Sequence, residues 1–319
     1  MNKIFIIIQR EYLTRVRKKS FIVMTLLTPL LMIALIGIPV WLENMNKSET
    51  KEIELLLKES SIEVKEQVVQ WSENSAGKET FEESALIIGM TTAVLIYFFI
   101  LIYGVQVMRG VVEEKVNRIV EIIVSSVKPF ELMIGKIVGI ALVGLTQFLI
   151  WAVLIVILLA AFGNNALSVD SIALSAFSSF NFAAILFFFI IYFLGGYLLY
   201  ASLFAAIGAA SDNETDTQQF MLPVIFPVLF ALFAAIQGAN NPDGSLAFWT
   251  SLIPFTSPIV MMVRIPAGVP AWELIVSVLL LLFSFIGTTW VAAKIYRTGI
   301  LMYGKKVNYR EIWKWMRYK

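Results

Sequence analysis

The sequence contains neither cysteine nor histidine among its 319 residues, and only 15% of its residues are charged. Without cysteine and histidine we expect no disulfide, no thiolate or imidazole metal site, no haem ligation through these residues, and no Ser-His or Cys-His nucleophile pair. Soluble domains carry roughly a quarter of charged residues. Here 59% of the residues are hydrophobic and the mean hydropathy is +0.80. This composition indicates a membrane protein.

Six long segments contain no charged side chain, and five of them are comfortably long enough to cross a bilayer, which takes about 20 helical residues. The fifth segment contains Pro223 and Pro227, which favour a kinked or partly re-entrant helix there. We therefore expect an all-α, polytopic membrane protein with six transmembrane helices. The expected spans are 21–41, 85–107, 137–162, 182–207, 220–236 and 274–293.

Basic residues are concentrated in alternate connecting segments. If the N-terminus is cytoplasmic, the inside segments hold 19 of the 25 Lys and Arg residues and the outside segments hold 6. Because short cytoplasmic loops are enriched in Lys and Arg, we expect both termini in the cytoplasm. The expected inside segments are 1–20, 108–136, 208–219 and 294–319, and the expected outside segments are 42–84, 163–181 and 237–273.

The segments at the two ends suggest contact with lipid headgroups. Residues 1–20 contain an amphipathic stretch, with apolar Phe5, Ile8, Tyr12 and Val16 opposite Arg10, Thr14, Arg17 and Lys18. It predicts a helix in the membrane interface, and a basic flank that only fixes topology is the alternative. The basic tail 294–319 carries interfacial aromatics, and we expect it along the headgroups. The outer segment 42–84 is short and acidic.

The apolar spans lack the reagents of membrane enzymes and ion-coupled carriers. All Asp and Glu lie in predicted loops or, for Glu273, at a helix boundary, so no carboxylate pair is available for acid–base work inside the membrane. There is no G-x-S-x-G or H-E-x-x-H motif. We expect no metal and no cofactor. Polar side chains that could line a cargo path, or form helix–helix hydrogen bonds instead, include Gln106, Gln147, Tyr192 and Tyr197.

No G-x-x-x-x-G-K-[ST] loop occurs in the sequence, so we do not expect the chain to bind the phosphates of ATP by itself. Any ATPase would be a partner that contacts the cytoplasmic loops. Arg109 to Lys136 suits such a contact, because nine charged residues stand between two uncharged spans. Residues 111–125 predict a helix with Glu114 and Arg118 paired at i,i+4, and Pro129 begins a second helix. A rigid lever and a solvated hairpin both fit this pattern.

The stretch EEKVNRIVEIIVSSVKPFELMIGK (113–136) closely resembles the cytoplasmic loop of ABC-2-type exporter permeases, particularly the branch related to bacterial sodium-export permeases. Three further stretches resemble the second cytoplasmic loop, the outer re-entrant helices and the C-terminal tail of that branch: SDNETDTQQFMLP (211–223), PFTSPIVMMVRIPAGVPAWE (254–273) and KIYRTGILMYGKK (294–306). The resemblance covers nearly the whole chain except 43–84, which is much shorter than the outer domain of many relatives.

This resemblance implies a multi-pass protein of the bacterial cytoplasmic (inner) membrane with an N-terminal interfacial helix and re-entrant helices before the last span. It implies a second permease copy or a related permease, and cytoplasmic ATPase subunits that bind the ATP. It also implies a coupling helix that carries Glu113, Glu114, Lys115, Asn117, Arg118 and Glu121. The cargo (sodium, drug, peptide or lipid) is left open, and no nucleic-acid partner is expected.

Two functions are compatible with the sequence. The first is the non-enzymatic permease subunit of an ATP-driven exporter, and the second is a membrane scaffold or sensor that docks a cytoplasmic protein through residues 109–136. Arg264 is the single basic residue of segment 237–273. It could pair with Glu273, gate the outer mouth, or contact lipid headgroups by snorkelling to the interface, and we expect the last of these.

Overall fold

The structure is a computed structural model that describes residues 3–29, 73–162, 181–302 and 309–316. These residues form helices and turns and no strand. A helical segment Lys19–Pro29 follows the first helix. The labelled elements are α1 (Lys3–Val16), α3 (Glu73–Val116), α4 (Ile119–Val124), α5 (Pro129–Phe162), α7 (Phe182–Ala210), α8 (Glu214–Asn240), α9 (Ser245–Leu252), α10 (Ser257–Arg264), η1 (Ile265–Ala267), α11 (Ala271–Gly299) and α12 (Tyr309–Trp315).

Five of these helices are long and apolar enough to cross a membrane, by length and composition. Together with the absence of strands from the described residues, they confirm an all-α, polytopic membrane protein. The candidate spans are Ala85–Val116, Pro129–Leu154, Ala183–Ala210, Thr215–Asn240 and Ala271–Gly299. The expected first span, 21–41, lies outside the described residues beyond Pro29, as do residues 42–72 of the outer segment.

The helices extend beyond the apolar limits on which the predicted spans were based. α3 continues through Glu113, Glu114 and Lys115, because Glu and Lys are good helix formers and paired charges do not stop a helix. α7 and α8 are separated by three residues only, 211–213, where the sequence predicted a loop over 208–219. α8 is one continuous helix that contains Pro223 and Pro227, and it is long and apolar enough to cross a membrane.

The chain divides into two compact units, which are described separately. The larger unit comprises Met1–Val16, Glu83–Leu145 and Phe180–Lys319, and the smaller one comprises Arg17–Glu82 and Thr146–Ser179. In the smaller unit the Trp151 indole N–H donates to the Thr25 carbonyl oxygen at 2.9 Å. This bond ties the helical segment Lys19–Pro29 to the second half of α5.

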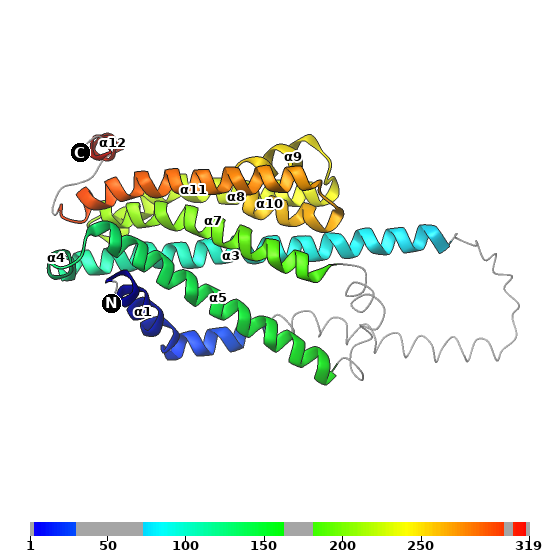
Figure 1. Ribbon diagram of the computed structural model, residues 1–319, viewed down its shortest axis with the longest axis horizontal. Helices are drawn as coiled ribbons and strands as arrows, with labels where there is room; N and C mark the ends of the chain where they lie inside the picture. The colour runs from blue at the N-terminus through cyan, green and yellow to red at the C-terminus, as the bar shows by residue number, and fades with distance from the viewer. Residues whose placement is uncertain (1–2, 30–72, 163–180, 303–308, 317–319) are drawn as a thin grey trace, which may run out of the picture. The chain divides into compact units, whose positions relative to one another are not determined.

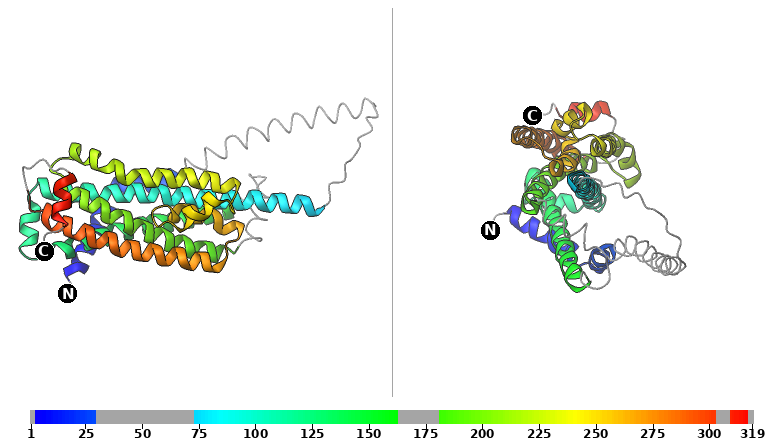
Figure 2. Two further views of the ribbon diagram at one scale, coloured as in Figure 1. Left: turned by 90° about the horizontal axis from the view of Figure 1, so that it is seen from above. Right: turned by 90° about the vertical axis from the view of Figure 1, so that its right-hand side faces the viewer.

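The core of the larger unit is built from α3, α5, α7 and α11. α7 and α11 lie side by side along their lengths (Figures 1 and 2). Phe99 stacks on Tyr103 within α3 and meets Phe193 of α7 edge-on, which joins α3 to α7. Ala201, Ala205 and Ala209 are fully buried on α7. These small side chains let neighbouring helices approach closely, which is how apolar helices associate.

Two short helices and a 3-10 turn fold back before α11, in the region where re-entrant helices were expected. All eight residues of α10 are buried, and α10 packs against α7, α8 and α9. Gly196 of α7 permits this packing, since a Cβ atom there would lie 2.7 Å from Pro258. Within the larger unit, α9 and α10 lie at the end opposite α4 (Figure 1). The α3–α4–α5 turn is therefore remote from the folded-back helices.

Candidate functional site

The segment between α3 and α5 is a compact turn of two helix ends and one short helix. α3 ends at Val116, Arg118 adopts a left-handed conformation (φ 55°, ψ 15°), and α4 then starts at Ile119. The predicted uninterrupted helix over 111–125 is therefore wrong. The change of chain direction at Arg118 buries Val120, which is 0% exposed. Part of the apolar face of α4 is therefore packed against the protein.

We call residues 116–130 the α4 tip. Four large apolar side chains of the α4 tip are exposed: Val116, Ile119, Ile122 and Phe130, with Ile122 at 75%. Of the predicted coupling residues, Asn117, Arg118 and Glu121 are exposed in the α4 tip and Glu113 is exposed just before it. The Lys128 amide N–H donates to the Glu131 carboxylate at 3.3 Å and caps the start of α5. The α4 tip thus combines apolar and charged groups at one accessible turn.

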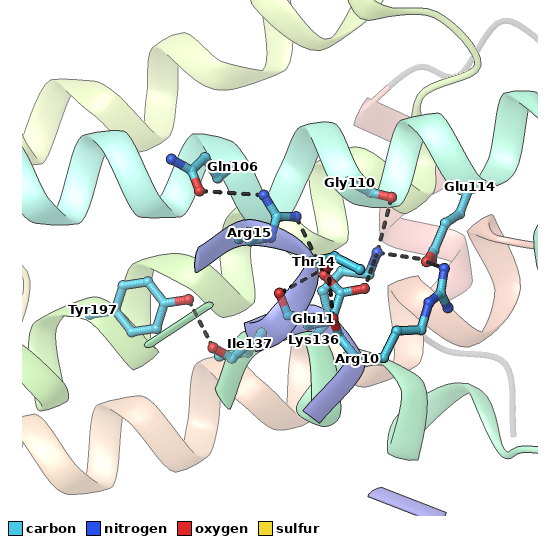
Figure 3. A network of polar contacts seen from close by, with 10 residues as sticks. All are labelled: Arg10, Glu11, Thr14, Arg15, Gln106, Gly110, Glu114, Lys136, Ile137 and Tyr197. Carbon is cyan, nitrogen blue, oxygen red and sulfur yellow. Dashed lines mark hydrogen bonds and ion pairs between the residues drawn. The ribbon is translucent and has the colours of Figure 1, made fainter. Parts of the chain in front are cut away.

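The other two predicted coupling residues, Glu114 and Lys115, are buried in the last turn of α3, at 6% and 1% exposure. Glu114 Oε2 lies 2.9 Å from Nζ of Lys136 on α5, and Glu114 Oε1 lies 3.5 Å from Nη2 of Arg10 on α1. Lys136 also donates to the Gly110 carbonyl oxygen at 3.0 Å. Figure 3 shows these groups converging between α1, α3 and α5.

α1 supplies the remainder of this charged cluster. Glu11 is buried, with Oε1 at 3.6 Å from Lys136 Nζ and Oε2 at 3.4 Å from Arg15 Nη2. Arg15 Nη1 donates to Gln106 Oε1 of α3 at 3.3 Å (Figure 3). We call the buried residues Glu11, Glu114 and Lys136 the buried charge cluster, and the half-buried Arg15 and the exposed Arg10 lie at its edge. The cluster joins α1 to α3 and α5, which lie much later in the sequence.

α1 forms as predicted, but it packs on the protein through a face that the amphipathic pattern did not identify. Ile7 and Glu11 are its buried residues. They lie over Gly135 and Gly139 of α5, where added Cβ atoms would come within 2.7 Å of Ile7 and Glu11 respectively. The two glycines therefore let α1 lie directly against α5, because only a residue without a side chain allows so close an approach.

Lys115 points to a different part of the protein from Glu114. Its Nζ lies 2.9 Å from Oδ1 of Asp212, in the short α7–α8 connection, and donates to the Ala209 carbonyl oxygen at 2.8 Å. Ala209 is also where α7 meets α11, since a Cβ atom on Gly299 would lie 2.8 Å from the Ala209 oxygen. Consecutive residues of α3 are therefore bonded on one side to α1 and α5 and on the other side to the α7–α8 connection.

These pairs place Glu11 in α1 and Glu114 in α3, although all Asp and Glu were expected in loops or at a helix boundary. Glu11, Glu114, Lys115 and Lys136 are buried within helices, and each is paired, as buried charges must be. Reasoning from the sequence missed Arg10, Glu11, Arg15, Lys136 and Asp212 as partners. One signal was available, because Glu11 is the single acidic residue among six basic ones in segment 1–20.

The predicted cargo-path residues are distributed over both units. Gln106 is half-buried and bonds to Arg15. Tyr192 and Tyr197 are fully buried in the helix core, and the Tyr197 hydroxyl donates to the Ile137 carbonyl oxygen at 2.9 Å (Figure 3). Gln147 belongs to the smaller unit. In this conformation the tyrosines pack helices together.

Arg264 is buried at 3% exposure and does not snorkel to an interface. Its Nη1 lies 2.8 Å from Oε2 of Glu273, which is itself 6% exposed, and donates to Ser251 Oγ at 2.7 Å. Its Nε donates to the Pro242 carbonyl oxygen at 2.7 Å. The pairing alternative is the correct one, since desolvated guanidinium and carboxylate groups require each other. The pair ties α9, α10 and α11 together.

Comparison with known proteins agrees with this architecture. A family profile described as "ABC-2 family transporter protein" matches residues 42–294. The chain is 31% identical over 246 residues to uncharacterized protein YhaP of Bacillus subtilis (strain 168), covering 74% of this chain and 57% of that protein. It is 27% identical over 236 residues to uncharacterized protein MJ1024 of Methanocaldococcus jannaschii, covering 74% of this chain and 54% of that protein.

The chain thus spans little more than half the length of these two relatives. No solved structure matches it. The family match extends over most of the chain and includes α3, the α4 tip, the folded-back helices and most of α11. Together with the five long apolar helices, this match establishes that the chain is a multi-pass membrane protein and belongs to the ABC-2 family of transporter permeases.

Proposed function

We propose that this chain is the permease subunit of an ATP-binding-cassette exporter that moves cargo outward using ATP hydrolysed by a separate cytoplasmic subunit. Membership of the ABC-2 family supports a transport role, and permeases of this family generally work with an ABC ATPase subunit. We further propose that two permease chains assemble in the cytoplasmic membrane of a bacterium with their termini inside. The uncharged middle portions of the spans suit an amphipathic or apolar cargo better than a bare ion.

The observation that carries this proposal is the exposed α4 tip. Val116, Ile119, Ile122 and Phe130 are large apolar side chains that remain exposed, although α4 itself is too short to cross a membrane. They are mixed with exposed Glu113, Arg118 and Glu121. Exposed apolar groups rimmed by charges are typical of protein-binding surfaces. An ATPase that docks at this turn would act directly on α3 and α5.

The competing function is a scaffold or sensor that uses the α4 tip to bind a protein without moving cargo. Purification of the chain from its own host in a mild detergent separates the two functions. Export predicts a co-purifying ATPase with a Walker motif, whose turnover rises when cargo is present. A co-purifying partner without that motif would support scaffolding and contradict the exporter assignment.

Substitution of Ile122 tests the docking surface itself. Ile122→Asp places a charge at the most exposed apolar position of the α4 tip, and we expect capture of the co-purifying ATPase to fall by about tenfold or more, as for a central interface residue. Leu301→Asp is the matched control, because Leu301 is also apolar and half exposed but lies after α11. Equal capture by the two variants would exclude Ile122 from the docking surface.

A further inference from the structure

The last turn of α3 holds two adjacent charged residues that the docking partner cannot reach. Glu114 and Lys115 are only 6% and 1% exposed to solvent. The neighbouring residues Glu113 and Asn117 are exposed. A residue that contacts a partner must present its polar atoms to it. The polar atoms of Glu114 and Lys115 are already engaged by groups of this chain, with closest approaches of 2.9 Å and 2.8 Å.

Glu114 belongs to a joint between three helices. Lys136 of α5 is the shared cation, 2.9 Å from Glu114 of α3 and 3.6 Å from Glu11 of α1. Arg10 reaches Glu114 from α1 at 3.5 Å, and the Lys3 ammonium donates to the Ser126 carbonyl oxygen in the α4 tip at 2.6 Å. α1 is therefore bonded both to the α4 tip and to the buried charge cluster. A displacement of the α4 tip must move α1 or break these bonds.

Lys115 forms a second joint on the other side of α3. It is held by Asp212 and by the carbonyl oxygen of Ala209, at the end of α7. The same part of α7 contacts Gly299 near the end of α11. Because α3 is continuous from Glu73 to Val116, it offers no flexible loop in which movement of its last turn would be absorbed.

We propose that Glu114 and Lys115 are positioning residues that pass displacement of the α4 tip into α1 and α5 through one joint and into α7 through the other, without touching the ATPase. This inference rests on the proposed function and refines it. The exposed residues bind the partner, and the buried ion pairs convert binding into helix movement. Neutralising Glu114 removes its ion pair with Lys136 of α5, and neutralising Lys115 removes its ion pair with Asp212. Each joint should therefore fail when its α3 residue is neutralised.

The absence of cysteine from the chain allows a direct spectroscopic test. Spin labels at Ile87→Cys on α3 and Ala183→Cys near the start of α7 report the ends of these helices remote from the α4 tip, and both parent residues are exposed. The doubly labelled chain is combined with the ATPase that co-purifies with it, and the label-to-label distance is measured without nucleotide and after trapping with ATP and vanadate. Capture of the ATPase is measured on the same samples.

We expect Glu114→Gln and Lys115→Met to capture the ATPase as well as the unaltered chain but to lose the nucleotide-driven distance change. Glu113→Gln is the matched control, since it removes the neighbouring exposed carboxylate. It should keep the full distance change once the ATPase is saturating, even where capture is weakened. If Glu114 and Lys115 were needed only for folding, their substitution would reduce capture of the ATPase and the distance change together.

The proposal would be overturned by loss of capture in a well-folded Glu114→Gln or Lys115→Met chain, or by an unaltered distance change in both variants. An unaltered chain that captures the ATPase but shows no distance change would also overturn it. If neutralisation prevents folding, Glu114→Asp and Lys115→Arg retain the charges, and partial loss of the distance change at full capture is then the expected result. Failure of the unaltered chain to capture any ATPase would instead refute the proposed function.

Discussion

At the scale of single residues, the main feature of this protein is that its buried charges lie beside groups of opposite charge. Lys136 has two carboxylates and a carbonyl oxygen within reach, and Arg264 has a carboxylate, a hydroxyl and a carbonyl oxygen. Desolvating an ion costs several kcal/mol unless such partners are supplied. Each set therefore fixes the relative position of the helices that contribute to it.

The Arg264 set gives a stability prediction. Glu273→Ala leaves the buried Arg264 guanidinium without its carboxylate, and we expect the variant to lose about 3–5 kcal/mol of stability, the usual cost of breaking a buried pair. A lowered midpoint of thermal unfolding in detergent, followed by tryptophan fluorescence, measures this loss. Asp243→Asn serves as the control, because Asp243 is exposed in the neighbouring α8–α9 connection. Equal midpoints for both variants would show that the pair does not hold α9, α10 and α11 together.

At the scale of elements, α1 shows how a surface helix becomes part of the core. Its amphipathic pattern predicted a helix in the interface, and Phe5 and Ile6 do remain exposed. The position of α1 is instead set by two contacts with α5. Glu11 pairs with Lys136, and Gly135 and Gly139 leave room for α1 because they have no side chains. A helix can thus present apolar residues to lipid on one side and a buried carboxylate to the protein on the other.

The contact between α1 and α5 can be tested at Gly139. A Cβ atom at this position would lie 2.7 Å from Glu11 Cβ and 3.1 Å from the Ile8 carbonyl oxygen, so Gly139→Val should displace α1 at a cost of about 1–3 kcal/mol, as for overpacking. The readout is the rate at which Ile7→Cys, buried in the parent structure, reacts with a maleimide in detergent. We expect a faster reaction in the Gly139→Val background.

Gly287→Val is the matched control for this experiment. Gly287 lies on α11 and has no atom within 4 Å of an added Cβ, so the same substitution there should leave the labelling rate of Ile7→Cys unchanged. If Gly139→Val and Gly287→Val gave the same rate, α1 would not be seated on the glycines of α5.

At the scale of the whole molecule, the distribution of basic residues predicts which end of the larger unit is cytoplasmic. The α4 tip and the start of α9 lie at opposite ends of this unit (Figure 1), and each offers an exposed serine, Ser125 and Ser245. Ser125→Cys and Ser245→Cys are therefore matched probes in a chain without other cysteines. A membrane-impermeant maleimide should label Ser245→Cys in intact cells and Ser125→Cys only after permeabilisation. The reverse pattern would show that the predicted orientation is inverted.

The residues predicted for coupling illustrate what the amino-acid pattern can and cannot specify. The length of the uncharged runs and the helical propensity of their flanks are local properties, so they predicted the helices and the charged turn between two of them. The direction of each side chain at that turn is not local. Glu113 and Glu114 are chemically identical neighbours, yet one is exposed and the other is buried.

Sequence alone therefore determined the all-α membrane class and the charged turn between two long apolar helices, because hydrophobic length and helix propensity act within one segment. Only the tertiary structure decided which charges are available to a partner. Glu114 is unavailable to a partner because it is buried against charged groups of two other helices. α1 contributes Arg10 and Glu11 from about a hundred residues earlier in the chain, and α5 contributes Lys136. Pairing energy between segments so far apart is invisible in any local pattern, since it depends on helices that meet only in the folded protein.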